Sequence, residues 1–175
     1  MDQNLQTILV HEILQHIDAG TTQLADEIYA NPVSNYTSTD RLSKELEVLF
    51  RQRPLLVGLS SQLPEPGDFL TCDHTGIPQL IVRGEDRTVR AFMNVCRHRG
   101  ARVAEGHGNT RKRFRCPYHG WNYDTSGKLV GIPDKQSFPG IDRPACSLIS
   151  LPVTESDGMI WASATPVLAS EASTK

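Results

Sequence analysis

The chain has 175 residues, enough for one domain with a sizeable core, and its 38% hydrophobic and 22% charged content excludes overall disorder. No run approaches the roughly 18 apolar residues of a membrane span, and no secretory signal follows Met1, so we expect a cytoplasmic protein without a membrane partner. The net charge of −2 and the lack of aromatic residues among the basic ones argue against nucleic-acid binding.

The first third of the chain has helical periodicity. Apolar residues recur at three- and four-residue spacing from Leu5 to Ile17, and Gly20 is a plausible stop. Leu24 and Ile28 predict a short second helix that ends before residues 31–32. A third helix is predicted from the capping oxygens of residues 38–40 to the Arg-Pro pair at 53–54.

The following residues have the rhythm of an antiparallel sheet, with short apolar runs separated by glycine or charged turns. Thr110–Arg115 alternates strictly, with arginines on one face. The chain after Pro166 is small and polar, and we expect a loose tail there. The fold class is therefore α+β, with strands predicted at residues 55–59, 68–73, 79–83, 88–94, 110–115, 148–152 and 158–162.

Two short motifs carry the candidate chemistry. Cys96-Arg-His98 and Cys116-Pro-Tyr-His119 are separated by seventeen residues, and a glycine bounds each of them. In a reducing compartment, cysteines and histidines spaced in this way are better interpreted as metal ligands than as disulfide partners. Two thiolates and two imidazoles suit a [2Fe–2S] cluster with one pair on each iron, and a structural zinc site is the alternative.

The residues around these motifs resemble the Rieske domain of the α subunits of ring-hydroxylating oxygenases. The resemblance is carried by the sequences NVCRHRG at residues 94–100 and FRCPYHGWNY at residues 114–123. It continues in LPEPGDF at 63–69, in RAF at 90–92 and in GKLVGIP at 127–133, and it covers about residues 35–165.

The resemblance implies that Cys96 and Cys116 bind an inner iron, and that His98 and His119 bind an outer iron through Nδ1. It also implies an antiparallel β fold with an N-terminal helical arm. The implied domains are the arm at 1–53, the Rieske domain at 54–165 with a two-loop cluster-binding subdomain at about 94–125, and the tail at 166–175. Tyr123 matches a tyrosine whose hydroxyl bonds a cysteine sulfur.

The implied function is the relay of single electrons. A ferredoxin or an NAD(P)H-dependent reductase would reduce the cluster, and a mononuclear iron in the same or a neighbouring α subunit would accept the electron. The family's iron-binding oxygenase domain follows the Rieske domain, whereas residues 162–175 contain no histidine. We therefore expect that this chain does not activate oxygen by itself. A free-standing Rieske ferredoxin and a zinc-stabilised binding module are the alternatives.

Some Rieske branches carry a disulfide and a serine donor that this chain cannot supply. Their extra cysteines match Ala101 and Tyr118, and their serine matches Trp121. With fewer donors to sulfur the reduced cluster is stabilised less. We expect a reduction potential in the lower part of the range of roughly −150 to +300 mV.

Other cysteines and histidines have simpler interpretations. His11 and His16 are spaced as in the family's mononuclear site, but on a helix they point about 140° apart. Cys72, Cys146 and His107 are expected to have no role in metal binding. Residues 96–120 carry a net charge of +6 and the rest of the chain −8, which steers an acidic partner or only keeps a hairpin soluble.

Overall fold

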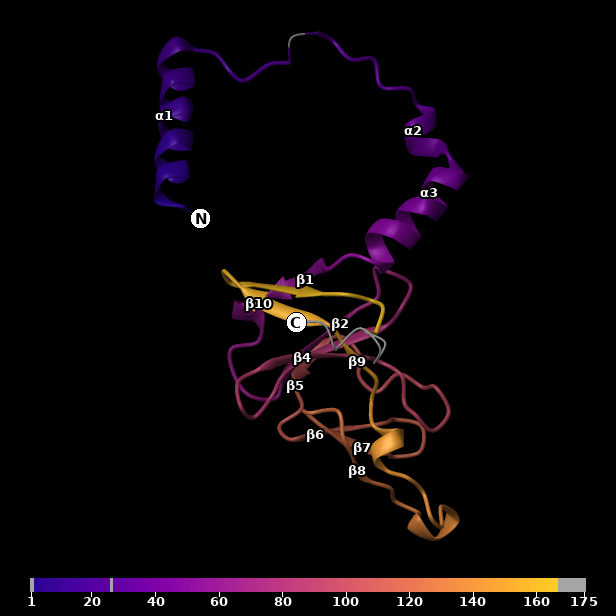
Figure 1. Ribbon diagram of the computed structural model, residues 1–175. Helices are drawn as coiled ribbons and strands as arrows, with labels where there is room; N and C mark the ends of the chain where they lie inside the picture. Colours follow the sequence, from indigo (N-terminus) through magenta and orange to yellow (C-terminus); the bar gives the residue numbers. More distant parts are fainter. Residues whose placement is uncertain (1, 26, 167–175) are drawn as a thin grey trace, which may run out of the picture. The chain divides into compact units, whose positions relative to one another are not determined.

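A computed structural model of the chain describes residues 2–25 and 27–166 (Figure 1). The described residues divide into two compact units, one up to Ser38 and the other from Thr39 onward. Both cysteine–histidine motifs lie in the second unit.

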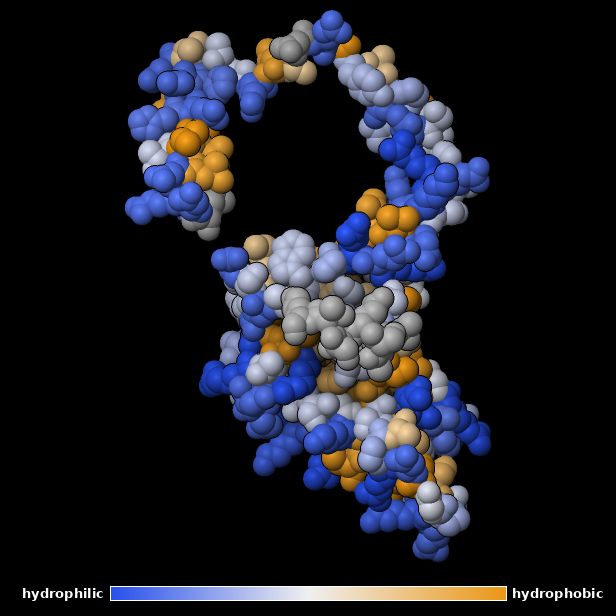
Figure 2. Space-filling view, in the orientation of Figure 1, coloured by the Kyte–Doolittle hydropathy of each residue, from blue (hydrophilic) through white to orange (hydrophobic). Residues whose placement is uncertain are grey.

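The first unit contains α1 (Gln3–Ala19), which confirms the first predicted helix. The Asp2 side chain accepts a hydrogen bond from the Asn4 backbone N–H, and so caps the start of the helix. At the end Gly20 adopts a left-handed conformation, with φ 60°, and its N–H bonds the last carbonyls. No residue of α1 is buried, and apolar side chains lie on its surface (Figure 2).

The predicted second helix around Leu24 and Ile28 is wrong. Residues 21–25 and 27–30 are not helical, and both apolar side chains are exposed. Short helices gain their stability from packing an apolar face, and the described residues of this segment are all exposed. A single helical turn, α2 (Ser34–Thr37), follows Pro32 instead.

The third predicted helix is confirmed at the start of the second unit. It consists of α3 (Thr39–Glu45) followed by a π-helical turn, η1 (Leu46–Arg51). Asp40 lies in the first turn and Lys44 in the last turn of α3, where their charges favour the helix dipole. The helical segment ends two residues before Arg53.

The second unit is built from three antiparallel sheets (Figure 1). The outer sheet has the order β1 (Leu55–Leu59), β11 (Met159–Ala162) and β10 (Val153–Ser156). The central sheet has the order β5 (His107–Asn109), β2 (Asp68–Cys72), β3 (Gln79–Arg83), β4 (Val89–Met93) and β9 (Ser150–Leu151). The small sheet consists of β6 (Arg113–Arg115), β7 (Asn122–Asp124) and β8 (Leu129–Gly131).

Strand β3 of the central sheet is buried on both faces and has no exposed residue, whereas the edge strand β5 is exposed. Leu80 and Val82 point into one core, whereas Ile81 between them points into the other, as the two-residue period of a strand requires. The first, which we call the loop-side core, includes Phe114 and Tyr123 of the small sheet. The second, the outer-sheet core, includes Ile160 of β11.

The predicted strands form in most segments, but one is shorter than expected and four strands were missed. Only Arg113–Arg115 of the predicted strand at 110–115 is extended, because Arg111 has φ 60° and forms a turn. Phe114 is buried between two exposed arginines, as the alternation indicated. Strands β5, β7, β8 and β10 were not predicted.

Three short helical turns complete the second unit, namely η2 (Ser60–Gln62), η3 (Lys135–Ser137) and η4 (Pro144–Cys146). Across residues 2–25 and 27–166 no helix is both long and apolar enough to cross a membrane. Most of the expected tail at 166–175 lies outside the described residues.

Candidate metal centre

The two cysteine–histidine motifs form loops with the same backbone hydrogen bonds. In the first loop the Cys96 N–H donates to the Ala101 carbonyl over 2.7 Å, and the Gly100 N–H donates to the Cys96 carbonyl over 2.9 Å. In the second loop Cys116 and Trp121 are joined over 2.8 Å, and Gly120 donates to Cys116 over 3.0 Å. Each loop therefore folds back on its own cysteine.

A glycine in left-handed conformation closes each loop. Gly100 has φ 75° and Gly120 has φ 69°, a backbone region that residues with a side chain rarely adopt. The histidine occupies the second position after the cysteine in the first loop and the third position in the second loop. The shared backbone thus presents one thiol and one imidazole per loop, with different offsets.

The two cysteine side chains lie beside each other in the loop-side core. Cys96 and Cys116 are each 2% exposed, and neither forms a disulfide. Burial is the main factor that raises the pKa of the Cys96 thiol, and the neighbouring Cys116 raises it further. A thiolate at this position therefore requires a positive charge close by, which a bound metal supplies.

Tyr123 on β7 places its hydroxyl next to one of these sulfurs. The hydroxyl oxygen lies 3.4 Å from Cys96 Sγ and accepts a hydrogen bond of 3.0 Å from the Arg97 N–H. Because the Arg97 bond uses the oxygen as an acceptor, the hydroxyl proton is available for the sulfur. Burial, followed by the bond to Cys96, raises the pKa of Tyr123, so the phenol stays protonated.

The two histidines lie together at the same end of the molecule. The centroids of the His98 and His119 rings are 4.6 Å apart, and their planes make an angle of 69°. His98 Nδ1 is buried and has no hydrogen-bond partner, although a buried polar atom normally has one. Burial, and then the charges of His119 and Arg99, lower the pKa of His98, which favours the neutral form that binds metals.

Asn94, directly before the first loop, fixes both ends of that loop. Its side-chain oxygen accepts hydrogen bonds from the N–H groups of Val103 and Ala104, at 2.9 and 3.1 Å. Its amide nitrogen donates to the Ala104 carbonyl over 2.8 Å, and the residue is fully buried. The loop is therefore held to β4 by a side chain as well as by the sheet.

This donor set fits a two-iron centre. Within the described parts of the chain, no three histidine, cysteine, aspartate or glutamate side chains converge on a point suited to one ion. The motifs provide two pairs instead, one of adjacent buried thiols and one of adjacent imidazoles with a buried, unbonded Nδ1. One pair for each iron is the ligand arrangement of a [2Fe–2S] centre with mixed ligands.

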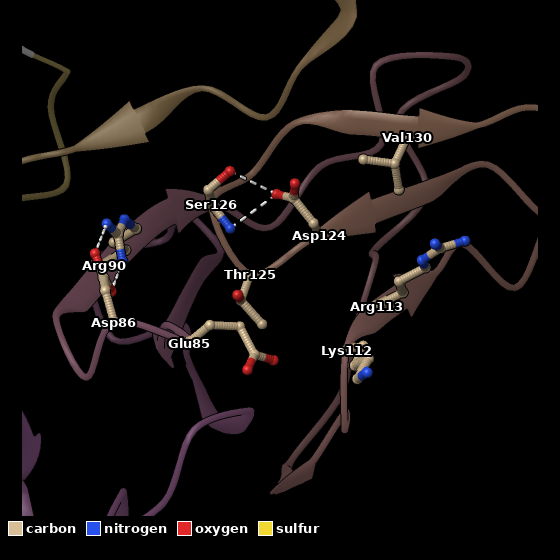
Figure 3. A pocket seen from close by; sticks show the side chains of 9 residues that line it. All are labelled: Glu85, Asp86, Arg90, Lys112, Arg113, Asp124, Thr125, Ser126 and Val130. Carbon is tan, nitrogen blue, oxygen red and sulfur yellow. Dashed lines mark hydrogen bonds and ion pairs between the residues drawn. The ribbon is translucent and has the colours of Figure 1, made fainter.

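Another cavity in the second unit lacks such chemistry (Figure 3). Its volume is about 610 Å³, and the Asp86 carboxylate on its wall forms two hydrogen bonds with the Arg90 guanidinium. Asp124 accepts hydrogen bonds from the Ser126 N–H and hydroxyl. Asp86 and Asp124 are thus engaged by neighbouring residues, and neither motif contributes a side chain to this cavity.

The remaining candidate residues lie outside the two motifs, although Cys146 packs against the loop-side core. His11 and His16 are on α1 in the first unit, where the His16 ring bonds the Thr21 hydroxyl. His107 is exposed on β5, and Cys72 is buried in the outer-sheet core. Cys146 is a half-buried free thiol. None of them joins the four motif residues.

Two adjacent loops, each with one cysteine and one histidine above a stack of antiparallel sheets, define an iron–sulfur protein of the mixed-ligand class. The chain belongs to the family of Rieske [2Fe-2S] domains, whose model matches residues 53–152. Members of this family hold one Rieske-type [2Fe–2S] cluster.

Similar proteins are α subunits of oxygenases. The chain is 36% identical to the biphenyl 2,3-dioxygenase subunit alpha of Rhodococcus jostii over 86% of its own length and 32% of that protein. It is 40% identical to the chlorobenzene dioxygenase subunit alpha of a Cupriavidus species, over 73% of its own length and 28% of that protein. The crystal structure of the quaternary ammonium Rieske monooxygenase CntA with an inhibitor is similar, with a TM-score of 0.73 and 31% sequence identity. The match covers 80% of this chain and 39% of the CntA chain.

The chain thus spans about a third of the length of these relatives and covers their Rieske region. The resemblance expected from the motifs is confirmed, as is the α+β fold with antiparallel sheets. Sequence reasoning did not identify the contact of the Phe138 ring with the His98 ring, because no local pattern marks a residue that reaches the site from another loop.

Proposed function

We propose that Cys96 and Cys116 bind one iron of a [2Fe–2S] cluster, and that His98 and His119 bind the other through Nδ1. The observation that carries this proposal is the pairing of the side chains, with two buried thiols in the same core cluster and two imidazoles 4.6 Å apart. The buried and unbonded His98 Nδ1 supports the choice of nitrogen.

The function that this site supports is single-electron transfer. When bound, a Rieske-type cluster accepts and donates one electron at a potential set by its ligands and by its surroundings. Tyr123 donates a hydrogen bond to the Cys96 sulfur. The buried Trp121 excludes water from the side of the site that faces the loop-side core. His119 is exposed at the surface, where a partner can approach it closely.

The relatives support a place for this electron transfer in an oxygenase. The names of the relatives are those of dioxygenase α subunits and a carnitine monooxygenase oxygenase subunit. We infer that a ferredoxin or an NAD(P)H-dependent reductase reduces the chain. The electron then passes to a mononuclear iron in an oxygenase domain, either of the same α subunit or of a neighbouring one.

The domain limits belong to the same proposal. We assign residues 1–53 to a helical arm, 54–165 to the Rieske domain and 166–175 to a tail, with the cluster-binding subdomain at about 94–125. The two compact units divide after Ser38, so η1 and α3 belong to the same unit as the sheets.

The test is to purify the chain anaerobically and to measure iron, acid-labile sulfide and the EPR spectrum after reduction. We expect about two irons and two sulfides per chain, with the spectrum of a reduced [2Fe–2S] centre. Cys116→Ser and His119→Ala should each lose the iron or change the spectrum. One zinc per chain without labile sulfide would contradict the proposal.

Matched controls are available within the chain. Cys146→Ser and His107→Ala remove a thiol and an imidazole that lie outside the two loops. Both variants should keep the iron content and the spectrum of the unmodified protein. A loss of iron in either control would show that the loss in the loop variants is not specific to the proposed ligands.

A further inference from the structure

Besides His119, two aromatic rings pack against the His98 ring. The indole of Trp121 is stacked on the imidazole, with a centroid distance of 4.9 Å and an interplanar angle of 8°. The ring of Phe138 meets the same imidazole nearly at right angles, at 5.4 Å and 85°. Phe138 also contacts Trp121 edge-on, at 5.5 Å. Together these contacts restrict the rotation of the His98 ring and fix the plane in which it lies.

Phe138 reaches this position from outside both loops. It directly follows η3, and its N–H donates to the Lys135 carbonyl over 3.2 Å. A cavity of about 280 Å³ is lined both by the two histidines and by residues of this segment, among them Phe138 and Pro133. The segment at 133–138 therefore lies over the histidine side of the centre.

The two histidines consequently have different surroundings. His98 is half-buried between Trp121 and Phe138. His119 is exposed, and its only aromatic neighbour besides His98 among the ring contacts of the described residues is Tyr118, which is itself 60% exposed. Water therefore reaches the His98 ring less freely than the His119 ring.

We propose that Phe138 is a positioning residue for His98, which it holds against Trp121 in the orientation that directs Nδ1 into the centre. This inference rests on the proposed function. Phe138 also provides an apolar cover. The oxidised centre, with two ferric ions, two sulfides and two thiolates, is neutral, and one added electron gives it a negative charge. Water stabilises the charged form, so the cover lowers the reduction potential.

The experiment compares Phe138→Ala and Phe138→Leu with the unmodified chain. The reduction potential reports on the apolar cover, and the hyperfine couplings of the two histidine nitrogens, measured by pulsed EPR, report on ring orientation. Phe138→Ala should shift the potential upward and change the coupling of one histidine while the other stays constant. Phe138→Leu should have a reduction potential close to that of the unmodified chain, because leucine is also apolar. It should still change the coupling of the same histidine nitrogen.

Phe50→Ala is the matched control, since it removes a phenylalanine of the same unit from η1 and should change neither quantity. If Phe138→Ala does not fold, the coupling measured in Phe138→Leu decides the question. Unchanged couplings in every folded Phe138 variant would overturn the inference. The proposed function fails separately, if the unmodified chain shows no iron–sulfur spectrum.

Discussion

The hydroxyl of Tyr123 is the side-chain donor that lies nearest to a cysteine sulfur of the site. A hydrogen bond to sulfur stabilises the reduced centre more than the oxidised one, because the reduced centre carries more negative charge on sulfur. The Tyr123→Phe variant also leaves the Arg97 N–H without its acceptor.

We expect Tyr123→Phe to lower the reduction potential by on the order of 50 mV, which corresponds to about 1 kcal/mol for one electron. Tyr118→Phe is the control, since it makes the same change at an exposed tyrosine of the second loop. A redox titration of the three proteins tests this, and equal potentials would contradict the assigned bond.

Gly127 shows how closely the small sheet packs on the central one. A Cβ at this position would lie 2.9 Å or less from three atoms of the Phe92 ring, and the backbone has φ 81°. Gly127→Ala should therefore destabilise the fold by about 2–4 kcal/mol, from both overlap and backbone strain.

Gly140→Ala separates these two effects. Gly140 has a similar φ of 72°, but a Cβ there would meet nothing within 4 Å. This variant should lower the free energy of unfolding by only about 1 kcal/mol, which is the contribution of backbone strain alone. Denaturant unfolding of both variants gives the comparison, and equal losses would mean that the contact with Phe92 is not tight.

At the scale of elements, an ion pair ties the central sheet to the outer sheet. Arg83 of β3 forms two hydrogen bonds with the Glu155 carboxylate of β10, at 2.7 and 2.9 Å. The hydrogen bond from Arg83, and next the one from Ser60, lower the pKa of Glu155 from 4.5 to about 2. A lowered carboxyl pKa stabilises the fold fully above about pH 4.5, and the stabilisation is lost as the pH falls toward 2.

Replacing Glu155 by glutamine should cost on the order of 2–3 kcal/mol at neutral pH. The difference from the unmodified chain should shrink as the pH falls from 6 to 2. Glu65→Gln is the control, because its pair with Arg87 is exposed on both sides and should contribute little at any pH. Denaturant unfolding at several pH values measures this, and a pH-independent difference at Glu155 would be inconsistent with the lowered pKa.

The sequence predicted elements well where the pattern is local. Alternating or apolar runs such as Gln79–Arg83 become strands because one or both of their faces are buried. Strands β5, β7 and β8 have three residues each, too few for a period, and they exist through pairing with neighbours. The helix predicted around Leu24 does not form, and the apolar side chains of Leu24 and Ile28 that suggested it are exposed.

The candidate site divides in the same way. Cysteine and histidine spacing within two short loops predicted the four candidate ligands, and the structure brings the thiols together and the imidazoles together. Phe138 is nineteen residues beyond His119, and nothing in the residues around it indicates that its ring meets His98. Such contacts depend on how the segment after β8 returns over the loops.

At the scale of the whole chain, positive charge is concentrated at the loops. Residues 96–120 carry +6 against −8 elsewhere, and Arg97 and Arg115 are exposed there. This distribution should speed the approach of an acidic electron donor. At low ionic strength, Arg97→Glu should slow reduction by an acidic [2Fe–2S] ferredoxin by on the order of tenfold.

The control for this variant is Arg53→Glu, which makes the same change of charge at an exposed arginine outside the stretch. The ferredoxin should reduce the Arg53→Glu variant at nearly the same rate as the unmodified chain. Stopped-flow measurements over a range of salt should show the Arg97 effect fading as ions screen the charges. A rate that depends equally on both arginines would mean that only the net charge matters.

The loop-side core contains Cys96 and Cys116 as packing residues beside Phe114 and Tyr123. If the two thiols hold the cluster as proposed, loss of iron should weaken the packing of this half of the second unit, because the thiols would no longer be held together by metal. A chelator should first open residues 94–132 to proteases, while the outer-sheet core, which shares none of these cysteines, persists. On the proposed ligand set, proteolysis of the iron-free chain should therefore begin at the two loops.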